Sequence, residues 1–143
     1  MPNIFNYEKL TTQKGIINMS KTVMIVEDYN DTRTLMKALV NWYGYDVIEA
    51  ADGYEAVEKS VQYHPDLILM DLALPIMDGA TATKLIREIV GFDKVSIVAL
   101  TGFSNTSFEK AIEAGFDNVL IKPLHYENLE PLLHRYLEDK TPQ

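Results

Sequence analysis

The sequence predicts an α/β fold, a three-layer sandwich in which helices cover both faces of a doubly wound, five-stranded parallel sheet. After residue 20, strand-like and helix-like segments alternate strictly. Most of the strand-like segments are nearly continuous runs of Val, Ile, Leu and Met, as expected for strands buried on both faces. Charged or hydroxyl residues follow these runs at the points where the strands should end. Short connections between the segments favour right-handed crossovers and hence helices on both faces.

The strands are delimited by apolar runs. The second of them, YDVIEA, is the most polar and is expected to form an edge of the sheet. The five strands are expected at residues 22–27, 45–49, 66–70, 95–100 and 118–121.

Capping residues and glycines delimit the helices. Asn30 is expected to cap a first helix that stops at Gly44, because glycine accepts the left-handed conformation that ends many helices. Asp52 and Glu55 resemble a capping box for a helix that ends near His64. Two further helices are expected, one that follows Gly79 and ends at about Gly91 and one over residues 104–114.

Pro131 complicates the last helix. Proline is poorly tolerated inside a helix but well tolerated in its first turn, so the regular helix is expected over residues 130–139, after a looser turn over 125–129. One domain then spans residues 21–139, followed by a tail over 140–143. Residues 1–20 show no strand or helix pattern and are expected to be a weakly ordered extension, with Met19 as a candidate natural start and a short packed helix as the alternative.

The composition excludes several classes of protein. The chain of 143 residues contains no cysteine, which rules out disulfides, thiolate zinc sites and thiol nucleophiles and fits a cytoplasmic location. A net charge of -8 argues against binding to nucleic acid or to anionic membranes. No apolar run approaches the ~20 residues that span a bilayer, and no signal peptide opens the chain. We therefore expect a cytoplasmic protein that has protein partners.

The polar residues at the strand ends form the candidate site. Glu27 and Asp28 follow the first strand, Asp71 the third, Thr101 the fourth and Lys122 the fifth. The carboxyl ends of parallel strands share one edge of a sheet, where ligands bind. The sequence therefore predicts a cluster of three carboxylates, one hydroxyl and one amine, which suits a divalent cation and a phosphoryl group.

In these residues the chain resembles the receiver domain of two-component response regulators, the CheY-like superfamily. The resemblance covers residues 21–139 and implies the strand order 2-1-3-4-5. Since no output domain accompanies this segment, it implies a stand-alone response regulator. The matching residues, in chain order, are Glu27, Asp28, Asp71, Pro75, Gly79, Thr101, Gly102, Lys122 and Pro123.

The resemblance implies a phosphoacceptor chemistry. Asp71 would take a phosphoryl group from the phosphohistidine of a sensor histidine kinase or a histidine phosphotransfer protein. The implied cofactor is Mg²⁺, with Mn²⁺ as an alternative. It would be held directly by Asp28 and Asp71, by Glu27 mostly through water, and by the backbone carbonyl of Ala73. Lys122 is expected to pair with Asp71 before phosphorylation.

The resemblance also implies a switch. After transfer, the Thr101 hydroxyl, the Gly102 amide and Lys122 would bind phosphoryl oxygens, and Thr101 would bias the loop that follows. The altered surface would then bind a downstream target protein or pass the phosphoryl group on; both roles stay open. The chain would be a self-phosphorylating and self-dephosphorylating switch, not a turnover enzyme. The residues expected to shape the loops are Pro75, Gly79 and Pro123, with a cis Lys122–Pro123 bond.

Two departures from the family pattern carry expectations. Receivers usually have Tyr or Phe three residues before the lysine, whereas this chain has Val119, so a weaker rearrangement on phosphorylation is expected. Phe103 could partly substitute for that ring. The positions that tune phosphate lifetime are Ala73 and Phe103, and neither side chain can orient an attacking water, so self-dephosphorylation should be slow.

Three alternatives compete with this interpretation. An acid-phosphatase-like hydrolase would need Asp-x-Asp at the acceptor strand, and here Ala73 stands two residues after Asp71. A flavodoxin-type carrier would need a phosphate-binding first loop, whereas EDYND would repel phosphate. A receiver that binds partners without phosphorylation is the third. Five further residues are expected to be surface, loop or packing residues: His64, His125, His134, Trp42 and Tyr43.

Overall fold

The computed structural model describes residues 20–102 and 108–138. These residues form a parallel sheet in the order β2-β1-β3-β4-β5, as the sequence predicts. The strands are β1 (Thr22–Val26), β2 (Asp46–Ala50), β3 (Leu67–Asp71), β4 (Ser96–Thr101) and β5 (Asn118–Ile121). The helices are α2 (Asn30–Trp42), α3 (Gly53–Tyr63), α4 (Gly79–Glu88), α5 (Phe108–Ala114) and α6 (Tyr126–Leu133), followed by a π-helical turn η1 (His134–Glu138).

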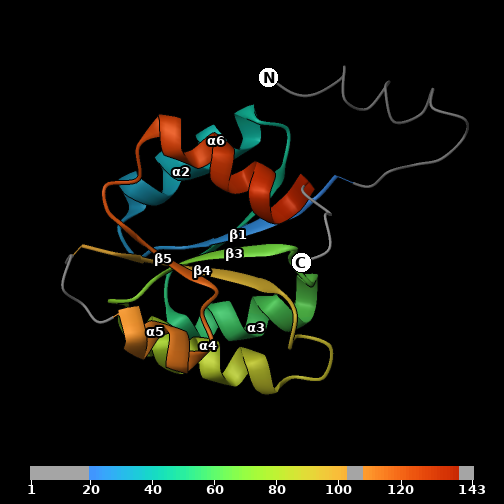
Figure 1. The fold of residues 1–143 in the computed structure, drawn as a ribbon, viewed down its shortest axis with the longest axis vertical. Helices are drawn as coiled ribbons and strands as arrows, with labels where there is room; N and C mark the ends of the chain where they lie inside the picture. Colours follow the sequence, from blue (N-terminus) through green and yellow to red (C-terminus); the bar gives the residue numbers. More distant parts are fainter. Residues whose placement is uncertain (1–19, 103–107, 139–143) are drawn as a thin grey trace, which may run out of the picture.

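The helices cover both faces of the sheet. Figure 1 shows α2 and α6 on one face and α3, α4 and α5 on the other. Alternate residues of β1 point to the two faces: Val23 and Ile25 pack under α2 and α6, whereas Met24 and Val26 pack under the other helices. All four side chains are fully buried, which explains why the central strands are continuous apolar runs without alternation.

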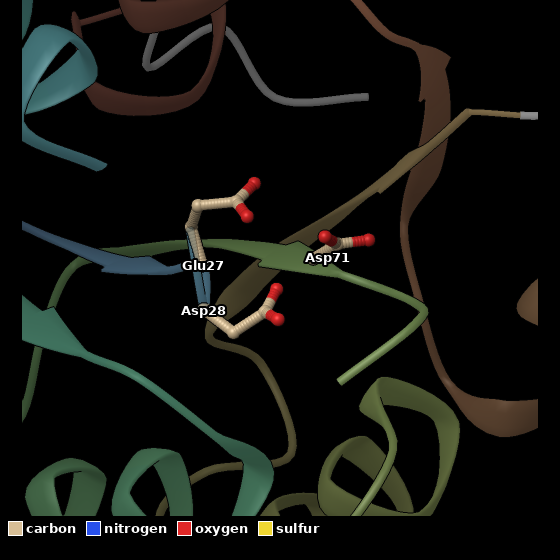
Figure 2. A group of neighbouring side chains, drawn as sticks. All are labelled: Glu27, Asp28 and Asp71. Atoms are coloured by element: carbon tan, nitrogen blue, oxygen red, sulfur yellow. The ribbon is translucent and has the colours of Figure 1, made fainter. Parts of the chain in front are cut away.

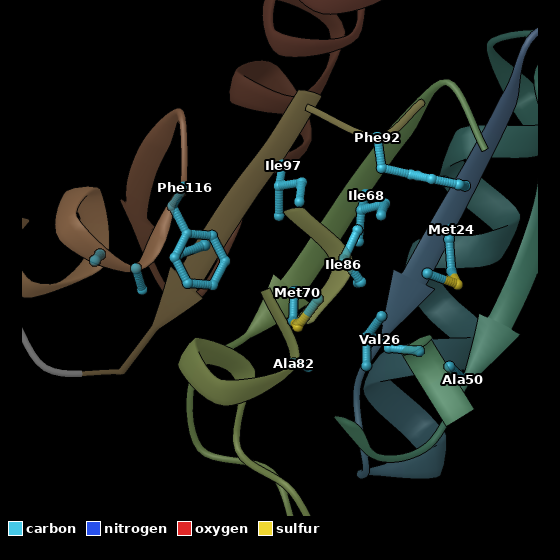
Figure 3. Close-up of a cluster of buried hydrophobic side chains, with 14 residues drawn as sticks. Met24, Val26, Ala50, Ile68, Met70, Ala82, Ile86, Phe92, Ile97 and Phe116 are labelled. Carbon is cyan, nitrogen blue, oxygen red and sulfur yellow. The ribbon is translucent and has the colours of Figure 1, made fainter. Parts of the chain in front are cut away.

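The core beneath α3, α4 and α5 is drawn in Figure 3. Met70 of β3 lies in this core with Ile86 of α4, and Phe92 and Phe116 join from the loops before β4 and β5. The Thr83 hydroxyl, buried on α4, donates to the Met70 sulfur at 3.9 Å. This packing fixes α4 beside β3, whose last residue is Asp71, so the core positions the candidate site.

The helix starts follow the sequence in part. Asp52 caps α3 as predicted, since its carboxylate accepts from the Glu55 amide at 2.8 Å. The expectation for Asn30 was wrong: the N-cap of α2 is Tyr29, and Asn30 is the first helical residue. The Asn30 side chain accepts instead from Arg33 at 2.6 Å, so a guanidinium occupies the oxygen that capping would have used.

The ends of the helices also differ slightly from expectation. Helix α2 ends at Trp42, and Gly44 takes the positive φ of 96° that was expected of it. Helix α4 stops at Glu88, earlier than residue 91, because Ile89 is already extended. The predicted start of the following helix at residue 104 lies outside the described residues, which resume at Phe108.

The last helix corrects a prediction. A loose turn was expected over residues 125–129, but α6 is regular from Tyr126 and includes Pro131. Proline removes one backbone hydrogen bond, yet Leu129, Leu132 and Leu133 are all buried against the core, and their burial outweighs that loss. The helix then widens into η1, which buries Leu137.

The remaining surface expectations hold with one exception. His64, His125 and His134 are exposed, as expected of loop and surface histidines. Tyr43 packs on the core beneath α2, but Trp42 is 66% exposed and does not pack there. No helix within residues 20–102 and 108–138 has the length and hydropathy to cross a bilayer.

Candidate functional site

The candidate site lies at the carboxyl edge of the sheet. In the strand register, Asp71 pairs with Leu100, and Thr101 pairs with Ile121. Glu27 directly follows β1, and its amide donates to the Ala50 carbonyl of β2 at 3.0 Å. The carboxyl ends of four neighbouring strands therefore supply the acids, the hydroxyl and the amine of the candidate site, as the sequence predicts.

Three carboxylates meet at this edge. Figure 2 shows Glu27 and Asp28 at the end of β1 beside Asp71 at the end of β3. One oxygen from each of the three lies within 4.8 Å of the others. Glu27 and Asp71 are buried, with 1% and 6% of their surface exposed, whereas Asp28 is exposed. Such closely placed anions repel one another unless a cation lies between them.

Lys122 supplies a positive charge to this cluster. Its ammonium donates to Asp71 Oδ2 at 2.9 Å, as predicted, and also to Glu27 Oε1 at 2.7 Å, which the sequence did not indicate. Burial by itself would lower the pKa of Lys122, but the hydrogen bonds to Glu27 and Asp71 outweigh it and raise that pKa. The lysine therefore stays charged between two buried carboxylates.

Backbone amides orient two of the carboxylates. The Tyr29 amide donates to Glu27 Oε2 at 3.0 Å, and the Ala73 amide donates to Asp71 Oδ1 at 3.1 Å. Each of these acids thus accepts from an amide with one oxygen and from Lys122 with the other. Ala73 is exposed beside the acceptor, and its methyl group offers no hydrogen bond.

The loop after Asp71 folds tightly over the strand end. The Gly79 amide donates to the Leu72 carbonyl at 3.0 Å. A Cβ on Gly79 would lie 2.3 Å from the Asp71 carbonyl oxygen, so only glycine fits here. Ile76 has a φ of 68° and is 84% exposed, a strained conformation for a β-branched residue. The predicted loop-shaping role of Gly79 thus has a steric cause.

The residues expected to bind the phosphoryl group lie on the same edge. Thr101 is buried at the end of β4, and its carbonyl accepts from the Lys122 amide at 2.7 Å. Gly102 is exposed, and among the residues that the structure describes no atom lies within 4 Å of the place where a Cβ would stand. The Lys122–Pro123 bond is cis, as expected. Phe103 lies outside the described residues.

The arrangement suits a divalent cation. Carboxylate oxygens are the ligands that Mg²⁺ prefers, and the cluster presents three of them beside open space at the exposed Asp28. Glu27, Asp28 and Asp71 could therefore hold Mg²⁺ at the sheet edge. The Lys122 ammonium neutralises only part of the negative charge of the three carboxylates, so a divalent cation would still be attracted.

The sequence pattern does not indicate two residues that lie near the site. Arg33 donates to the Glu27 backbone carbonyl at 2.7 Å, and nothing in its sequence position distinguishes it from other surface arginines. Gly53 approaches the loop after Asp71 so closely that a Cβ would lie 2.0 Å from the Met77 carbonyl oxygen. Its place after the cap Asp52 marks a helix start but gives no sign of that contact.

Val119 replaces the aromatic ring expected on β5. It is partly buried and packs against the core beneath α3, α4 and α5. The position therefore contributes to packing with an aliphatic side chain, and the weaker rearrangement expected on phosphorylation stays a prediction.

The chain is similar in sequence to known proteins. The polar-differentiation response regulator DivK of Brucella ovis is 33% identical over 122 residues, covering 85% of this chain and 99% of its own. The transcription factor SKN7 of Saccharomyces cerevisiae is 33% identical over 148 residues, covering 99% of this chain but 23% of its own. The chain therefore spans about a quarter of SKN7 and nearly all of DivK.

Solved structures show the same fold. The receiver domain of sensor histidine kinase PA1611 from Pseudomonas aeruginosa, with a magnesium ion coordinated in its active site cleft, superposes with a TM-score of 0.78 at 32% identity, covering 85% of this chain and 100% of that one. The receiver domain of Ssk1, in complex with the histidine phosphotransfer protein Ypd1 of Saccharomyces cerevisiae, matches with a TM-score of 0.75 at 29% identity, covering 82% and 88%.

The family model of the response regulator receiver domain matches residues 23–134, which include every candidate residue from Glu27 to Lys122. Together with the strand order and the acidic cluster at the sheet edge, this match establishes that the chain belongs to the response regulator receiver domain family.

Proposed function

We propose that the protein is a phosphoacceptor switch in which Asp71 receives a phosphoryl group. The single observation that carries this proposal is the position of the Asp71 carboxylate, buried and held between the Ala73 amide and the Lys122 ammonium, 4.8 Å or less from two further acids. A carboxylate in a purely structural role would need no such set of neighbours.

The reaction needs a nucleophile and a way to neutralise charge. One Asp71 oxygen would attack the phosphorus atom of a phosphohistidine, forming a P–O bond while the P–N bond breaks and its electron pair returns to the imidazole. Lys122 lies within hydrogen-bond distance of Asp71 and would follow the phosphoryl oxygens as they arrive. Bound Mg²⁺ would neutralise developing negative charge.

The charge balance favours phosphoryl binding only with a cation. Three carboxylates and one ammonium leave the cluster net negative, so a phosphoryl group would be repelled. We therefore propose that phosphorylation depends on Mg²⁺, with Mn²⁺ as a substitute. Glu27, Asp28, Asp71 and the Ala73 carbonyl are the proposed ligands.

Thr101 and Gly102 would complete the switch. Thr101 is buried at the end of β4 and precedes the segment of the chain that leads to α5. A phosphoryl group on Asp71 would give its hydroxyl and the Gly102 amide a new acceptor and so shift the residues that follow. The output is a changed protein surface, so the protein would act as a switch and not as a turnover enzyme.

The proposed phosphodonor is a sensor histidine kinase or a histidine phosphotransfer protein. This is supported by the similar Ssk1 receiver domain, which was solved in complex with the phosphotransfer protein Ypd1. The net charge of -8 favours protein partners over nucleic acid or anionic membrane surfaces. The downstream partner is proposed to be a protein that distinguishes the two states of the switch.

Intact mass after incubation with acetyl phosphate tests the proposal. The wild type should gain one phosphoryl group in the presence of Mg²⁺ and none with EDTA, and Asp71→Ala should gain none. Intact mass is a better readout than tryptophan fluorescence. Trp42 is largely exposed and lies at the far end of α2, about 18 Å along the helix from the end that starts at the site.

The result that would contradict the proposal is a correctly folded wild type that gains no phosphoryl mass with Mg²⁺ at any donor concentration. The favoured function would then be a receiver fold that binds partners without phosphorylation. Circular dichroism of wild type and Asp71→Ala provides the control for folding.

A further inference from the structure

Arg33 connects α2 to the acidic residues at the end of β1. Its side chain is 16% exposed and makes three hydrogen bonds with different groups. Nη1 donates to the Glu27 backbone carbonyl at 2.7 Å, Nε to Glu49 Oε1 at 3.1 Å and Nη2 to Asn30 Oδ1 at 2.6 Å. One guanidinium thus joins the site, the edge strand β2 and the first turn of α2.

The carbonyl that Arg33 contacts belongs to the peptide that links Glu27 to Asp28. Because a peptide group is planar, holding its oxygen fixes the orientation of the whole unit. The two acidic side chains branch from the two ends of this peptide. A rotation of the peptide would move both carboxylates relative to Asp71.

Asp28 depends most on this contact. The Glu27 carboxylate is also held by Lys122 and by the Tyr29 amide. Within residues 20–102 and 108–138, the Asp28 carboxylate accepts no hydrogen bond, and its residue is exposed. No hydrogen bond from this part of the chain holds the Asp28 side chain, so its place beside Asp71 depends more on its backbone, whose preceding carbonyl Arg33 contacts.

Glu49 keeps Arg33 in place. Its carboxylate accepts from Arg33 with one oxygen and from Lys37 with the other, at 3.0 Å. Lys37 belongs to the same helix and shares the same acid, but it makes no hydrogen bond or ion pair with Glu27 or Asp28. The two cations therefore differ in one respect that matters here, the hydrogen bond to the peptide of the acidic pair.

We propose that Arg33 is a positioning residue that preorganises Glu27 and Asp28 for a divalent cation. The inference rests on the proposed function, since it concerns the same metal-binding carboxylates. Groups that hydrogen-bond to the metal-ligating residues without binding the metal typically change metal affinity by about 10- to 100-fold when they are removed. Arg33 touches neither the metal nor the phosphoryl group and acts through the peptide alone.

Isothermal titration calorimetry with Mg²⁺, and with Mn²⁺ as a second cation, tests the inference on unphosphorylated protein. Arg33→Met keeps the length of the apolar stem and removes the guanidinium. It should bind Mg²⁺ about 10-fold more weakly than the wild type. Lys37→Met, which removes the other cation from Glu49, should bind Mg²⁺ as the wild type does.

Phosphorylation by acetyl phosphate gives a second readout. In Arg33→Met, the Mg²⁺ concentration for half-maximal rate should rise about 10-fold, whereas the rate at saturating Mg²⁺ should stay close to that of wild type. Arg33→Lys should restore part of the affinity, because an ammonium can reach the Glu27 carbonyl without forming the other two bonds. A purely structural role would lower the urea midpoint and leave both metal readouts unchanged.

Each outcome has a distinct meaning. If the wild type binds Mg²⁺ and Arg33→Met binds it equally well, the inference is overturned while the proposed function stands. If the wild type itself binds no Mg²⁺ and is not phosphorylated, the proposed function fails first. Should Arg33→Met not fold, Glu49→Gln and Arg33→Lys replace it. Unchanged Mg²⁺ affinity in both of those variants would also overturn the inference.

Discussion

Glu49, which pairs with Arg33 and Lys37, links the stability of the fold to pH. A hydrogen bond from Lys37, and then one from Arg33, lower the pKa of Glu49, and burial opposes them. Since the folded pKa lies below the ordinary value of 4.5, the charged form stabilises the fold. This contribution is complete above pH 4.5 and is lost as the pH falls through the folded pKa.

The prediction for Glu49 concerns acid stability. Between pH 6 and pH 3.5, the urea midpoint of Glu49→Gln should fall less than that of the wild type, because glutamine has no charge to lose. Glu58→Gln, at an exposed position on α3, should keep the wild-type slope. Equal slopes for Glu49→Gln and wild type would show that the pKa of Glu49 is not lowered in the folded protein.

Ala73 is the residue expected to govern the lifetime of the phosphorylated state. It is exposed two residues after the acceptor, and only its backbone amide reaches Asp71. A methyl group cannot orient a water molecule for attack on phosphorus. The phosphoryl group on Asp71 should therefore persist for many minutes in Mg²⁺ buffer after the donor is removed, and Ala73→Asn should lose it several-fold faster.

The decay is measured by intact mass after desalting. A wild-type half-life of seconds would contradict the expectation for Ala73, and so would an Ala73→Asn variant that decays no faster. The control is Ala38→Asn, at an exposed position on α2 that lies away from the acceptor, which should decay as the wild type does.

At the scale of elements, the loop between β3 and α4 is held by close backbone contacts. A Cβ on Gly79 would lie 2.3 Å from the Asp71 carbonyl oxygen and 3.1 Å from the Leu72 Cα. Both are backbone atoms of the acceptor strand and its loop, so relief of the clash must move the segment that carries Asp71. A Cβ on Gly102, which follows β4, would meet no atom within 4 Å among the described residues.

Gly79→Ala should therefore destabilise the protein by about 1–3 kcal/mol, the usual range for overpacking, although alanine is the better helix former. Gly102→Ala should change the free energy of unfolding by less than about 0.5 kcal/mol. Urea denaturation compares the two variants. Gly79→Ala as stable as the wild type would mean that the loop can move away without cost.

The sequence predicts the elements better than their ends. The strand order and the strand ends that carry Asp71 and Lys122 follow from apolar runs and the parallel-sheet rule. The N-cap at Tyr29 does not, because the sequence pattern gives no sign that the Asn30 side-chain oxygen accepts from Arg33. Likewise, Pro131 lies inside α6 because of leucines packed on the core, and local propensity cannot measure that burial.

The site was predictable as a set of residues but not as a set of contacts. The cluster of Glu27, Asp28, Asp71 and Lys122 follows from four strand ends on one edge. The hydrogen bond from Lys122 to Glu27 joins residues that are 95 apart in the sequence, and it depends on which carboxylate lies nearer the ammonium. The role of Arg33 depends on the direction of one backbone carbonyl, which no residue pattern encodes.

Across the whole molecule, the two ends of the sheet have separate tasks. The carboxyl edge carries the acidic cluster, and the opposite edge is held by Arg87 of α4. Its guanidinium donates to the carbonyls of Gly115, Phe92 and Val95 and pairs with Asp117 at 3.0 Å. Asp117 in turn accepts from the Ile97 amide at the start of β4.

Arg87→Ala should lower stability without changing the site. Several carbonyls and a carboxylate lose their donor, so a loss of about 2 kcal/mol or more is expected. The Mg²⁺ affinity should stay at the wild-type value, because Arg87 contacts no residue of the carboxyl edge. Lys84→Ala, at an exposed position on the same helix, is the control. A fall in Mg²⁺ affinity at full folding would show that the two edges are coupled.

Chemical mapping of the phosphoryl group tests whether Asp71 is the phosphoacceptor. The protein is phosphorylated with acetyl phosphate and Mg²⁺, reduced with borohydride, which converts an aspartyl phosphate to homoserine, and digested for peptide sequencing by mass spectrometry. We expect homoserine at position 71 and at no other aspartate. Homoserine at position 28, or unmodified Asp71 in protein that has gained a phosphoryl group, would contradict the assignment of Asp71 as the phosphoacceptor.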